Sequence, residues 1–205
     1  MEQWLKLLAE QWEYVVLFIA GSTIVSGVVV SFAMTRAAPH KPAAVERVPV
    51  ATATMALFFV IAFVVGRLEL GQIELPAAMA TAVKVAGSVL VIYASVINIA
   101  GRVALGHFWS DQIEISTDHR LVRSWPYNWS RHPLYGSMIL FGVGMGLLML
   151  NPVVVGAVLG IFVPAMHYRS VREEALLLDA LGDTYRTYQR EIRMLIPLPG
   201  KRRTQ

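Results

Sequence analysis

The segment that decides the fold begins with RHPLY at 131–135 and continues through two apolar runs, LYGSMILFGVGMGLLML at 134–150 and PVVVGAVLGIFVPAMH at 152–167. Only Asn151 separates the two runs, and an Asn-Pro pair is a turn signal. Together the runs are too long for one crossing of a bilayer, which needs roughly 20 residues. We therefore predict a tight helical hairpin. The alternative is one long helix that Pro152 bends.

Charged residues flank this predicted hairpin at both of its open ends. Arg131 and His132 lie just before it, and Arg169 and Glu173 lie just after it. The ends of a hairpin meet on one side of the bilayer, so these groups could close over one shared polar cofactor. Arg169 and Glu173 are four residues apart and could instead simply pair on one helical face. Ionisable residues at a membrane boundary are costly and usually functional, which favours a site.

Three further apolar runs precede the hairpin, at 14–34, 48–66 and 76–100, and each is close to the roughly 20 residues of a spanning helix. Lys84 is the charge that lies within them. Hydrophobic residues make up 56% of the 205 residues, above the usual share of a soluble domain. We therefore predict an all-α integral membrane protein with about five transmembrane helices, a C-terminal helical hairpin and a cytoplasmic cofactor pocket.

Positively charged residues predict how these helices are oriented, because cytoplasmic loops carry an excess of Lys and Arg. Such residues follow the first, third and fifth apolar runs, whereas the loop after the second run holds only Arg67. This alternation predicts an N-terminus outside and a cytoplasmic C-terminus, in a plasma or inner membrane. The segments 101–133 and 168–205 then share the cytoplasmic face, where the basic tail favours anionic lipid headgroups.

Several other function classes fit the sequence poorly. The net charge is +4, and the basic residues cluster at the ends of the apolar runs and in the C-terminal tail. This distribution indicates membrane topology and headgroup contact rather than nucleic-acid binding. The five histidines show no H-E-x-x-H or other tight ligand spacing, so no metal site is predicted. The glycine-rich stretch at 142–146 lies inside an apolar run and lacks the G-x-G-x-x-G spacing of a dinucleotide site. The absence of cysteine excludes disulfides and thiolate catalysis.

Two glycine pairs predict close packing of the hairpin helices. Gly142 and Gly146 are four residues apart in the first helix, and Gly156 and Gly160 are four apart in the second. Small residues at this spacing let membrane helices approach closely. The same faces could pack within one chain or between chains, so the oligomeric state stays open.

Two further segments have the spacing of helices at a membrane surface. Residues 1–12 carry Trp and Leu on one side, which predicts an interfacial helix. Residues 172–192 also predict a helix, with an apolar side that packs against the rest of the protein. That side is formed by Leu176, Leu177, Leu181, Tyr185 and Tyr188.

An ordered set of short motifs extends over residues 98–197, about half of the chain. Its members are Gly106, Phe108-Trp109-Ser110, Gln112, His119-Arg120-Leu121-Val122, Tyr127, Arg131-His132-Pro133-Leu134-Tyr135, Arg169, Glu173-Glu174, Leu181-Gly182, Tyr185, Tyr188 and Ile196-Pro197. In this order the set resembles the isoprenylcysteine carboxyl methyltransferase family of integral-membrane methyltransferases, to which phospholipid methyltransferases are related. The chain departs from the family pattern at His107 and at 124–127, which concerns the substrate more than the cofactor.

The resemblance implies a methyltransferase that uses S-adenosylmethionine, held between the cytoplasmic loop and the C-terminal helices. The implied cofactor-binding residues are Gln112, His119, Arg120, Leu121, Val122, Tyr127, His132, Pro133, Leu134, Tyr135 and Glu173. Arg169 and Glu173 are the implied catalytic residues, and Arg169 and Arg102 the substrate-binding ones. The chain then divides into residues 1–100, with the interfacial helix and three transmembrane helices, and a methyltransferase core at 101–205.

Methyl transfer from a sulfonium is compatible with these residues. The donor is already activated, so the enzyme chiefly aligns two reactants, and alignment can supply roughly 7–11 kcal/mol of the barrier. The planar guanidinium of Arg169 suits a carboxylate acceptor. The acceptor itself stays open among a prenylcysteine carboxylate, a phospholipid amine and other lipidic or small hydrophobic nucleophiles.

Two rival functions remain. Membrane sterol-type reductases share a similar C-terminal motif and use NADPH, but they are usually longer than this chain. A non-enzymatic membrane scaffold or transport subunit is the other alternative, and the scarcity of charge within the apolar runs argues against transport.

Overall fold

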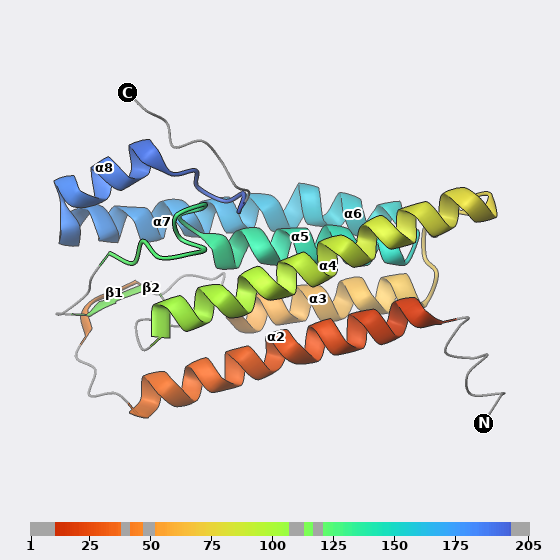
Figure 1. Cartoon of the computed structure of the whole chain (residues 1–205), viewed down its shortest axis with the longest axis horizontal. Helices are drawn as coiled ribbons and strands as arrows, with labels where there is room; N and C mark the ends of the chain where they lie inside the picture. The colour runs from red at the N-terminus through yellow and green to blue at the C-terminus, as the bar shows by residue number, and fades with distance from the viewer. Residues whose placement is uncertain (1–10, 38–41, 47–51, 107–112, 117–120, 198–205) are drawn as a thin grey trace.

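The computed structural model describes residues 11–37, 42–46, 52–106, 113–116 and 121–197, and Figure 1 labels its elements. The elements are α2 (Trp12–Ala37), β1 (Pro42–Glu46), α3 (Thr52–Arg67), α4 (Ala77–Leu105), β2 (Ile113–Ser116), α5 (Pro133–Leu148), α6 (Pro152–Ala157), the π-helical segment η2 (Val158–Phe162), α7 (Val163–Leu181) and α8 (Asp183–Glu191). The long helices run side by side along the length of the molecule (Figure 1).

The predicted hairpin is confirmed, because α5 and α6 are separate helices joined by a tight turn. Leu150 in this turn has a positive φ of 48°. The Asn151 side-chain oxygen accepts a hydrogen bond from the Val154 amide at 3.0 Å, which caps the start of α6. Its amide nitrogen donates to the carbonyl of Leu70 at 3.0 Å and ties the turn to the loop after α3. The alternative of one bent helix is therefore wrong.

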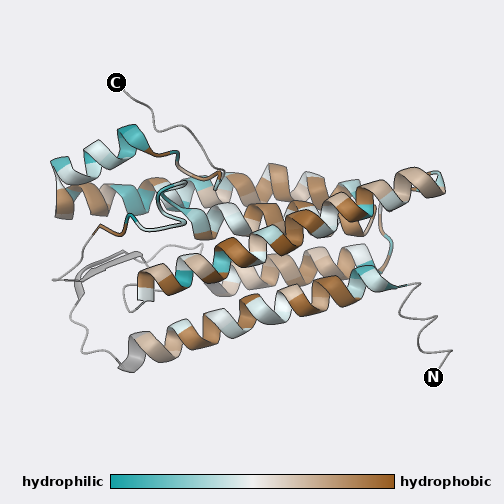
Figure 2. Ribbon diagram, in the orientation of Figure 1, coloured by the Kyte–Doolittle hydropathy of each residue, from teal (hydrophilic) through white to brown (hydrophobic). Residues whose placement is uncertain are grey.

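Among the described residues, three helices are long and apolar enough to cross a bilayer, and hydrophobic residues predominate along much of their length (Figure 2). They are Trp12–Met34, Ala77–Leu105 and Pro152–Leu181, the last of which runs through α6, η2 and α7. Ala53–Arg67 and Pro133–Leu148 are shorter apolar helices. A helix of 16 residues is about 24 Å long, less than the hydrocarbon thickness of about 30 Å. A multi-pass helical membrane fold is thus confirmed, while the number of five crossings stays a prediction.

Two glycines bring the backbones of α4 and α5 together, and these two helices form the most extensive helix pair. A Cβ atom on Gly87 would lie 2.8 Å from the Gly144 carbonyl oxygen, and one on Gly144 would lie 2.8 Å from the Gly87 carbonyl oxygen. Side chains at these two positions would force the helices apart. The contact fixes the position of α5, which carries the RHPLY motif at its start.

The first predicted glycine pair makes the expected contact within the hairpin. A Cβ atom on Gly142 would lie 2.8 Å from the Val158 side chain, and one on Gly146 would lie 2.7 Å from the Val155 side chain. The second helix therefore lies directly against these two glycines.

The prediction for the second glycine pair is wrong. Nothing lies within 4 Å of a Cβ atom placed on Gly156 or Gly160. The buried positions of this helix are Val154 and Val158, so the residues two positions further along face away from the hairpin partner.

A short antiparallel sheet, which the all-α prediction does not contain, pairs β1 with β2 outside the long helices. Val45 lies opposite Glu114 in this sheet. The first strand comes from the loop after α2 and the second from the loop before α5, so no local pattern announces their pairing. Because β2 also contacts α7, the sheet connects the N-terminal half of the chain to that helix. We call RHPLY at 131–135 the first motif and the segment from Arg169 to Glu174 on α7 the second motif.

The C-terminal helical region differs from the single helix predicted for 172–192. Gly182 adopts a positive φ of 55°, which ends α7 at Leu181, and α8 then turns back alongside it (Figure 1). Glycine reaches this conformation without the strain that a side chain would add. The interfacial helix predicted for 1–12 lies almost entirely outside the described residues, since α2 begins at Trp12.

Lys84, the charge within the third apolar run, has a partner on a neighbouring helix. Its ammonium nitrogen lies 2.6 Å from a carboxylate oxygen of Glu13, at the start of α2. Charged groups away from water are tolerated when they pair, so this contact offsets the cost of placing both in an apolar surrounding. The pair lies near the N-terminal ends of α2 and α4, whereas the two motifs lie at the other end of the helices (Figure 1).

Candidate functional site

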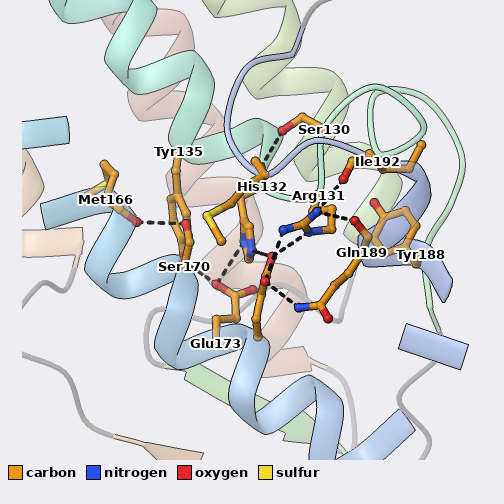
Figure 3. Close-up of polar contacts among 12 residues, drawn as sticks. Ser130, Arg131, His132, Tyr135, Met166, Ser170, Glu173, Tyr188, Gln189 and Ile192 are labelled. Carbon is orange, nitrogen blue, oxygen red and sulfur yellow. Dashed lines mark hydrogen bonds and ion pairs between the residues drawn. The ribbon is translucent and has the colours of Figure 1, made fainter. Parts of the chain in front are cut away.

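The start of α5 and the middle of α7 bring the two sequence motifs together. His132 is the N-cap residue of α5, and Pro133 begins the helix, where the missing amide hydrogen is no loss. On the facing helix α7, Arg169 and Glu173 are one turn apart. Figure 3 shows the side chains of His132, Tyr135 and Glu173 converging between the two helices.

Glu174 is the centre of a buried charged cluster and is only 5% exposed. Its Oε1 atom accepts from Arg131 Nε at 2.7 Å and lies 3.0 Å from His132 Nε2. Its Oε2 atom accepts from Gln189 Nε2 at 2.6 Å and from Arg131 Nη2 at 3.3 Å. An ionised carboxylate can only accept, which assigns a proton to His132 Nε2. One carboxylate thereby joins the start of α5, the helix α7 and the end of α8.

Residues 192–197, which we call the C-terminal strap, lie across the first motif. The Arg131 amide donates to the Arg193 carbonyl at 2.8 Å, and the His132 amide donates to the Met194 carbonyl at 2.9 Å. The Arg131 side chain also donates to backbone carbonyls at the end of α8. These bonds satisfy backbone groups around the start of α5 and hold the motif in place.

Gly136 allows the strap to lie this close to α5. A Cβ atom on Gly136 would overlap the Leu195 carbonyl oxygen and would lie 2.8 Å from the Pro197 ring. We expect Gly136→Ala to displace the strap and lower the free energy of unfolding by about 1–3 kcal/mol, the usual cost of forced overpacking. The melting temperature and the rate of proteolytic cleavage after Arg193 both measure this.

Gly156→Ala is the matched control for this substitution, because a Cβ atom there has nothing within 4 Å. Alanine favours a helix over glycine, so we expect the melting temperature of the control to stay the same or rise slightly. Equal stability and equal cleavage in both variants would show that the strap is not held against α5 as described.

A second polar chain runs through Tyr135 and connects Arg169 to Glu173. Arg169 Nε donates to the Tyr135 hydroxyl at 2.7 Å, and this hydroxyl donates to Glu173 Oε2 at 2.7 Å. The Arg169 guanidinium also lies over the Tyr135 ring, 5.5 Å from its centre. The His132 ring stacks on the same tyrosine ring, with the two ring centres 5.5 Å apart. The tyrosine therefore lies between the two residues that the sequence predicts to pair.

The two adjacent glutamates differ in their access to solvent. The Glu174 side chain is 7% exposed, whereas the Glu173 side chain is 31% exposed. Arg169 beside it is buried, with 3% exposed. The site thus presents one accessible carboxylate next to a buried guanidinium, an arrangement that can meet a ligand carrying both charge signs.

Three tyrosines form the wall between α8 and the loop before α5. The Tyr188 hydroxyl donates to the Tyr127 carbonyl at 2.6 Å, and Tyr185 packs beside Tyr188 with ring centres 5.8 Å apart. Burial raises the pKa of Tyr185 and of Tyr188 above the usual value. Burial also raises the pKa of Tyr127, and the nearby Glu173 carboxylate raises it further. These phenols therefore stay neutral donors at physiological pH.

Four of the predicted site residues lie in direct contact: His132, Tyr135, Arg169 and Glu173. The other predicted residues of α5, Pro133 and Leu134, are buried in its first turn, and Tyr127 lies in the tyrosine wall. Leu121 packs against the apolar cluster of α7 and α8, and Val122 beside it is half-buried. Gln112, His119 and Arg120 lie outside the described residues.

Arg102 occupies a different place from these residues, near the C-terminal end of α4. Its Nε atom donates to the Asn98 side chain at 3.0 Å, and its Nη1 atom lies 3.5 Å from the Ser31 hydroxyl of α2. Asn98 in turn donates to the Ser137 hydroxyl of α5 at 2.9 Å. Arg102 is therefore connected to the first turns of α5 through the buried side chains of Asn98 and Ser137.

Glu174 and Gln189 are absent from the binding and catalytic residues that the resemblance implies, and so is Arg131, although its place beside the hairpin made it a candidate. A signal for Glu174 was present, because it is four residues after Ser170 and three before Leu177, both of which are buried. That spacing places Glu174 on the inner side of α7 and Glu173 beside it toward solvent. No local signal marks Gln189, whose contact depends on the break at Gly182.

The fold and the site together define a multi-pass helical membrane protein with a charged site at one end of its helices. Residues 87–179 match the sequence model of the Isoprenylcysteine carboxyl methyltransferase (ICMT) family. This part of the chain is similar to that family.

Three curated relatives share the name Protein-S-isoprenylcysteine O-methyltransferase. The Tribolium castaneum protein is 33% identical over 86 residues, covering 42% of this chain and 31% of its own length. The Saccharomyces cerevisiae protein is 32% identical over 117 residues, covering 55% and 48%, and the Xenopus laevis protein is 27% identical over 122 residues, covering 57% and 41%. The chain thus spans less than half the length of the curated relatives it matches.

A solved structure described as the eukaryotic intramembrane Ras methyltransferase ICMT has a similar fold. The TM-score is 0.58 over 72% of this chain and 53% of that chain. At 23% sequence identity the likeness concerns the fold alone.

Proposed function

We propose that this protein is a membrane-embedded methyltransferase that uses S-adenosylmethionine and methylates the carboxylate of a prenylcysteine-type, lipidic acceptor. The observation that carries the proposal is the pairing of an accessible carboxylate, Glu173, with a buried guanidinium, Arg169, through one tyrosine hydroxyl. The curated relatives named for isoprenylcysteine O-methylation support the choice of acceptor.

The charges of the site fit S-adenosylmethionine, which carries a positive sulfonium and ammonium beside a carboxylate. Glu173 is the accessible anion of the site and suits the positive groups. Glu174 is already surrounded by Arg131, His132 and Gln189 and contributes the frame rather than a ligand contact. His132, Tyr127 and Tyr135 would form the surrounding walls.

S-adenosylmethionine supplies a methyl group on a positively charged sulfur that leaves as a neutral thioether. Arg169 would hold the acceptor carboxylate that takes up this methyl group, and Glu173 would hold the positive groups of the cofactor. The acceptor loses its negative charge and becomes a methyl ester, so no general base is needed. Alignment of the two reactants then supplies roughly 7–11 kcal/mol of the barrier.

Arg169 would orient the acceptor carboxylate in this reaction. Its guanidinium is held by the Tyr135 hydroxyl and lies over the Tyr135 ring, so its direction is set before any ligand binds. Arginine binds a carboxylate through two parallel hydrogen bonds, which also fixes the direction of the attacking oxygen. Glu173 is connected to the Arg169 guanidinium through the Tyr135 hydroxyl and partly offsets its positive charge.

The site end of the helices faces the cytoplasm, where the cofactor is dissolved, and the N-terminus lies outside. Basic residues at that end contact anionic headgroups. Residues 101–205 form the catalytic core, and residues 1–100 form the membrane support.

Replacing Tyr135 with phenylalanine removes the hydroxyl that connects Arg169 to Glu173. Hydrogen bonds to charged groups contribute about 1.5–3 kcal/mol, so we expect kcat/KM to fall between about tenfold and a hundredfold. Tyr168→Phe is the matched control, because Tyr168 is exposed and lies next to Arg169 in the sequence. Equal activity of the two variants would remove Tyr135 from the mechanism.

The direct test of the proposed function follows transfer of a labelled methyl group in lipid nanodiscs. N-acetyl-S-farnesylcysteine is the acceptor, and its methyl ester, which has no free carboxylate, is the negative control. We expect label in an alkali-labile ester on the first compound only. Absence of label from both compounds, with protein shown to be folded, would refute carboxyl methylation of this acceptor class.

A further inference from the structure

The loop before α5, residues 121–130, is attached to α8 at its outer end by an ion pair. A guanidinium nitrogen of Arg123 contacts a carboxylate oxygen of Glu191, the last residue of α8. The same guanidinium lies over the Tyr188 ring, 5.4 Å from its centre. Glu191 lies beyond the segment that matches the family model. This attachment is separate from the buried charged cluster that frames the site.

The inner end of the same loop is held by buried contacts. The Tyr188 hydroxyl donates to the Tyr127 carbonyl at 2.6 Å, and both tyrosines are buried. The Ser130 hydroxyl donates to the Met194 carbonyl at 2.9 Å, and Ser130 is buried as well. Breaking such bonds leaves buried polar groups without partners, which costs more than separating groups that water can reach. The inner end therefore stays in place under conditions in which the outer end can open.

The ion pair at the outer end is exposed enough to open and close. The Arg123 side chain is 45% exposed and the Glu191 side chain is 32% exposed. In the buried cluster, the corresponding values for Arg131 and Glu174 are 10% and 7%. An exposed pair contributes little stability and is screened by salt, whereas a buried pair is screened much less. Ionic strength can therefore weaken the outer attachment while it leaves the frame of the site intact.

Tyr127 connects this loop to the candidate cofactor site. It lies within electrostatic reach of the Glu173 carboxylate. It also forms one wall of the site together with two tyrosines of α8, Tyr185 and Tyr188. Because the wall takes residues from both the loop and α8, these two segments must stay together for the wall to stay closed.

We infer that the ion pair of Arg123 with Glu191 is a latch that holds the loop 121–130 against α8 and thereby slows the exit of the bound cofactor. The inference rests on the proposed function, since it takes the site around Glu173 to bind S-adenosylmethionine. Arg123 and Glu191 are positioning residues, because they act on the cofactor through Tyr127 and the tyrosine wall and do not contact the reacting atoms.

The test measures how fast labelled S-adenosylhomocysteine leaves the whole chain in phosphatidylcholine nanodiscs after addition of excess unlabelled compound. This lipid carries no net charge, so it does not compete for Arg123. Arg123→Gln and Glu191→Gln each remove one charge of the latch, and the double variant removes both. Arg186→Gln is the matched control, because it breaks an exposed ion pair with Asp183 that lies within α8.

We expect Glu191→Gln to speed dissociation about threefold and Arg123→Gln about fivefold, since the second variant also loses the contact with the Tyr188 ring. The double variant should resemble Arg123→Gln alone, because the two charges act through each other. Raising the salt concentration from about 0.05 M to about 0.5 M should speed dissociation from wild type but hardly from Arg123→Gln. Arg186→Gln should stay within about 1.5-fold of wild type at each salt concentration.

Two further measurements separate a latch from a general loss of stability and from a role in the chemical step. In ligand-free protein, amide hydrogen exchange at residues 121–125 should be faster in both latch variants, whereas exchange at residues 130–135 should not change. The single-turnover rate of methyl transfer at saturating S-adenosylmethionine should change by less than about twofold, so that binding of the cofactor weakens while the chemical step stays the same.

Two results would overturn the inference. Equal dissociation rates in wild type and Arg123→Gln would show that the ion pair does not hold the cofactor. Effects of the single variants that multiply in the double variant would show that the two residues act independently. The proposed function would stand in both cases, because S-adenosylhomocysteine still binds. Failure of folded wild-type protein to bind this compound would instead refute the proposed function, and the inference with it.

Discussion

Replacing Glu174 with glutamine is expected to lower the free energy of unfolding by about 3–5 kcal/mol, the usual result of removing one partner from a buried ion pair. Glu174 is 5% exposed and accepts hydrogen bonds from Arg131, His132 and Gln189. Glutamine has nearly the same shape but leaves the buried Arg131 guanidinium without its counter-charge. Because the cluster joins α5, α7, α8 and the C-terminal strap, we also expect faster proteolysis of the strap.

Glu173→Gln is the matched control for stability, since it makes the same chemical change one residue away. The Glu173 side chain is 31% exposed and accepts a hydrogen bond from Tyr135, so its melting temperature should stay close to that of wild type. The measurement is thermal unfolding of both variants in the same detergent. If Glu174→Gln melts with the wild type, the buried cluster is not the frame of the site.

The second large effect concerns activity, and here Glu173→Gln is the variant that we expect to be strongly impaired. Glu173→Gln removes the accessible anion of the site, and we expect kcat/KM for methyl transfer to fall about 100-fold, equivalent to about 2.7 kcal/mol. Binding of S-adenosylhomocysteine should weaken as well, because the ammonium group loses a charged partner. Initial rates at varied cofactor concentration measure both.

Asp179→Asn is the control for this second prediction, because Asp179 is an exposed carboxylate on the same helix. It should leave kcat/KM unchanged, which separates the role of Glu173 from a general effect of charge near the membrane. Retention of full activity by Glu173→Gln would exclude Glu173 from the reaction and remove the main support for the proposed cofactor orientation.

The membrane hairpin was predictable because its evidence is local. Two apolar runs separated by Asn151 and Pro152 specify both the helices and the turn, and the observed cap at Asn151 follows from the chemistry of that side chain. The contact of Gly142 with the second helix followed from residue spacing. The rotation of that second helix did not, because spacing alone does not say that Val154 and Val158 face inward.

The sequence identified residues that the structure brings together, but not how their side chains contact one another. Arg169, Tyr135 and Glu173 were identified and lie in contact, yet the tyrosine hydroxyl between the two charges depends on how α5 meets α7. The role of Glu174 depends on donors from three distant segments, including Gln189 on α8. The break between α7 and α8 at Gly182 allows that contact. The apolar residues keep a helical spacing on both sides of Gly182, so the sequence pattern suggests one continuous helix.

Contacts made by the first hundred residues were the least accessible to sequence reasoning. The β1–β2 sheet pairs segments from two loops, and the packing of α2 against α4 depends on the close approach of Gly27 to Ile99. Both are contacts between segments distant in the chain, and no local sequence pattern predicts which segments pair. Non-local pairing of this kind is decided by the packing of the whole bundle.

The central claim is that the site around Glu173 binds S-adenosylmethionine, and thermal unfolding of the purified protein with S-adenosylhomocysteine tests it most directly. A ligand at about 100 times its Kd stabilises the folded state by about 2.7 kcal/mol, so the melting temperature of wild type should rise by about 5–10 °C. Glu173→Gln should lose most of this rise, and NADPH should produce none. A rise with NADPH but none with S-adenosylhomocysteine, in folded wild-type protein, would contradict the claim.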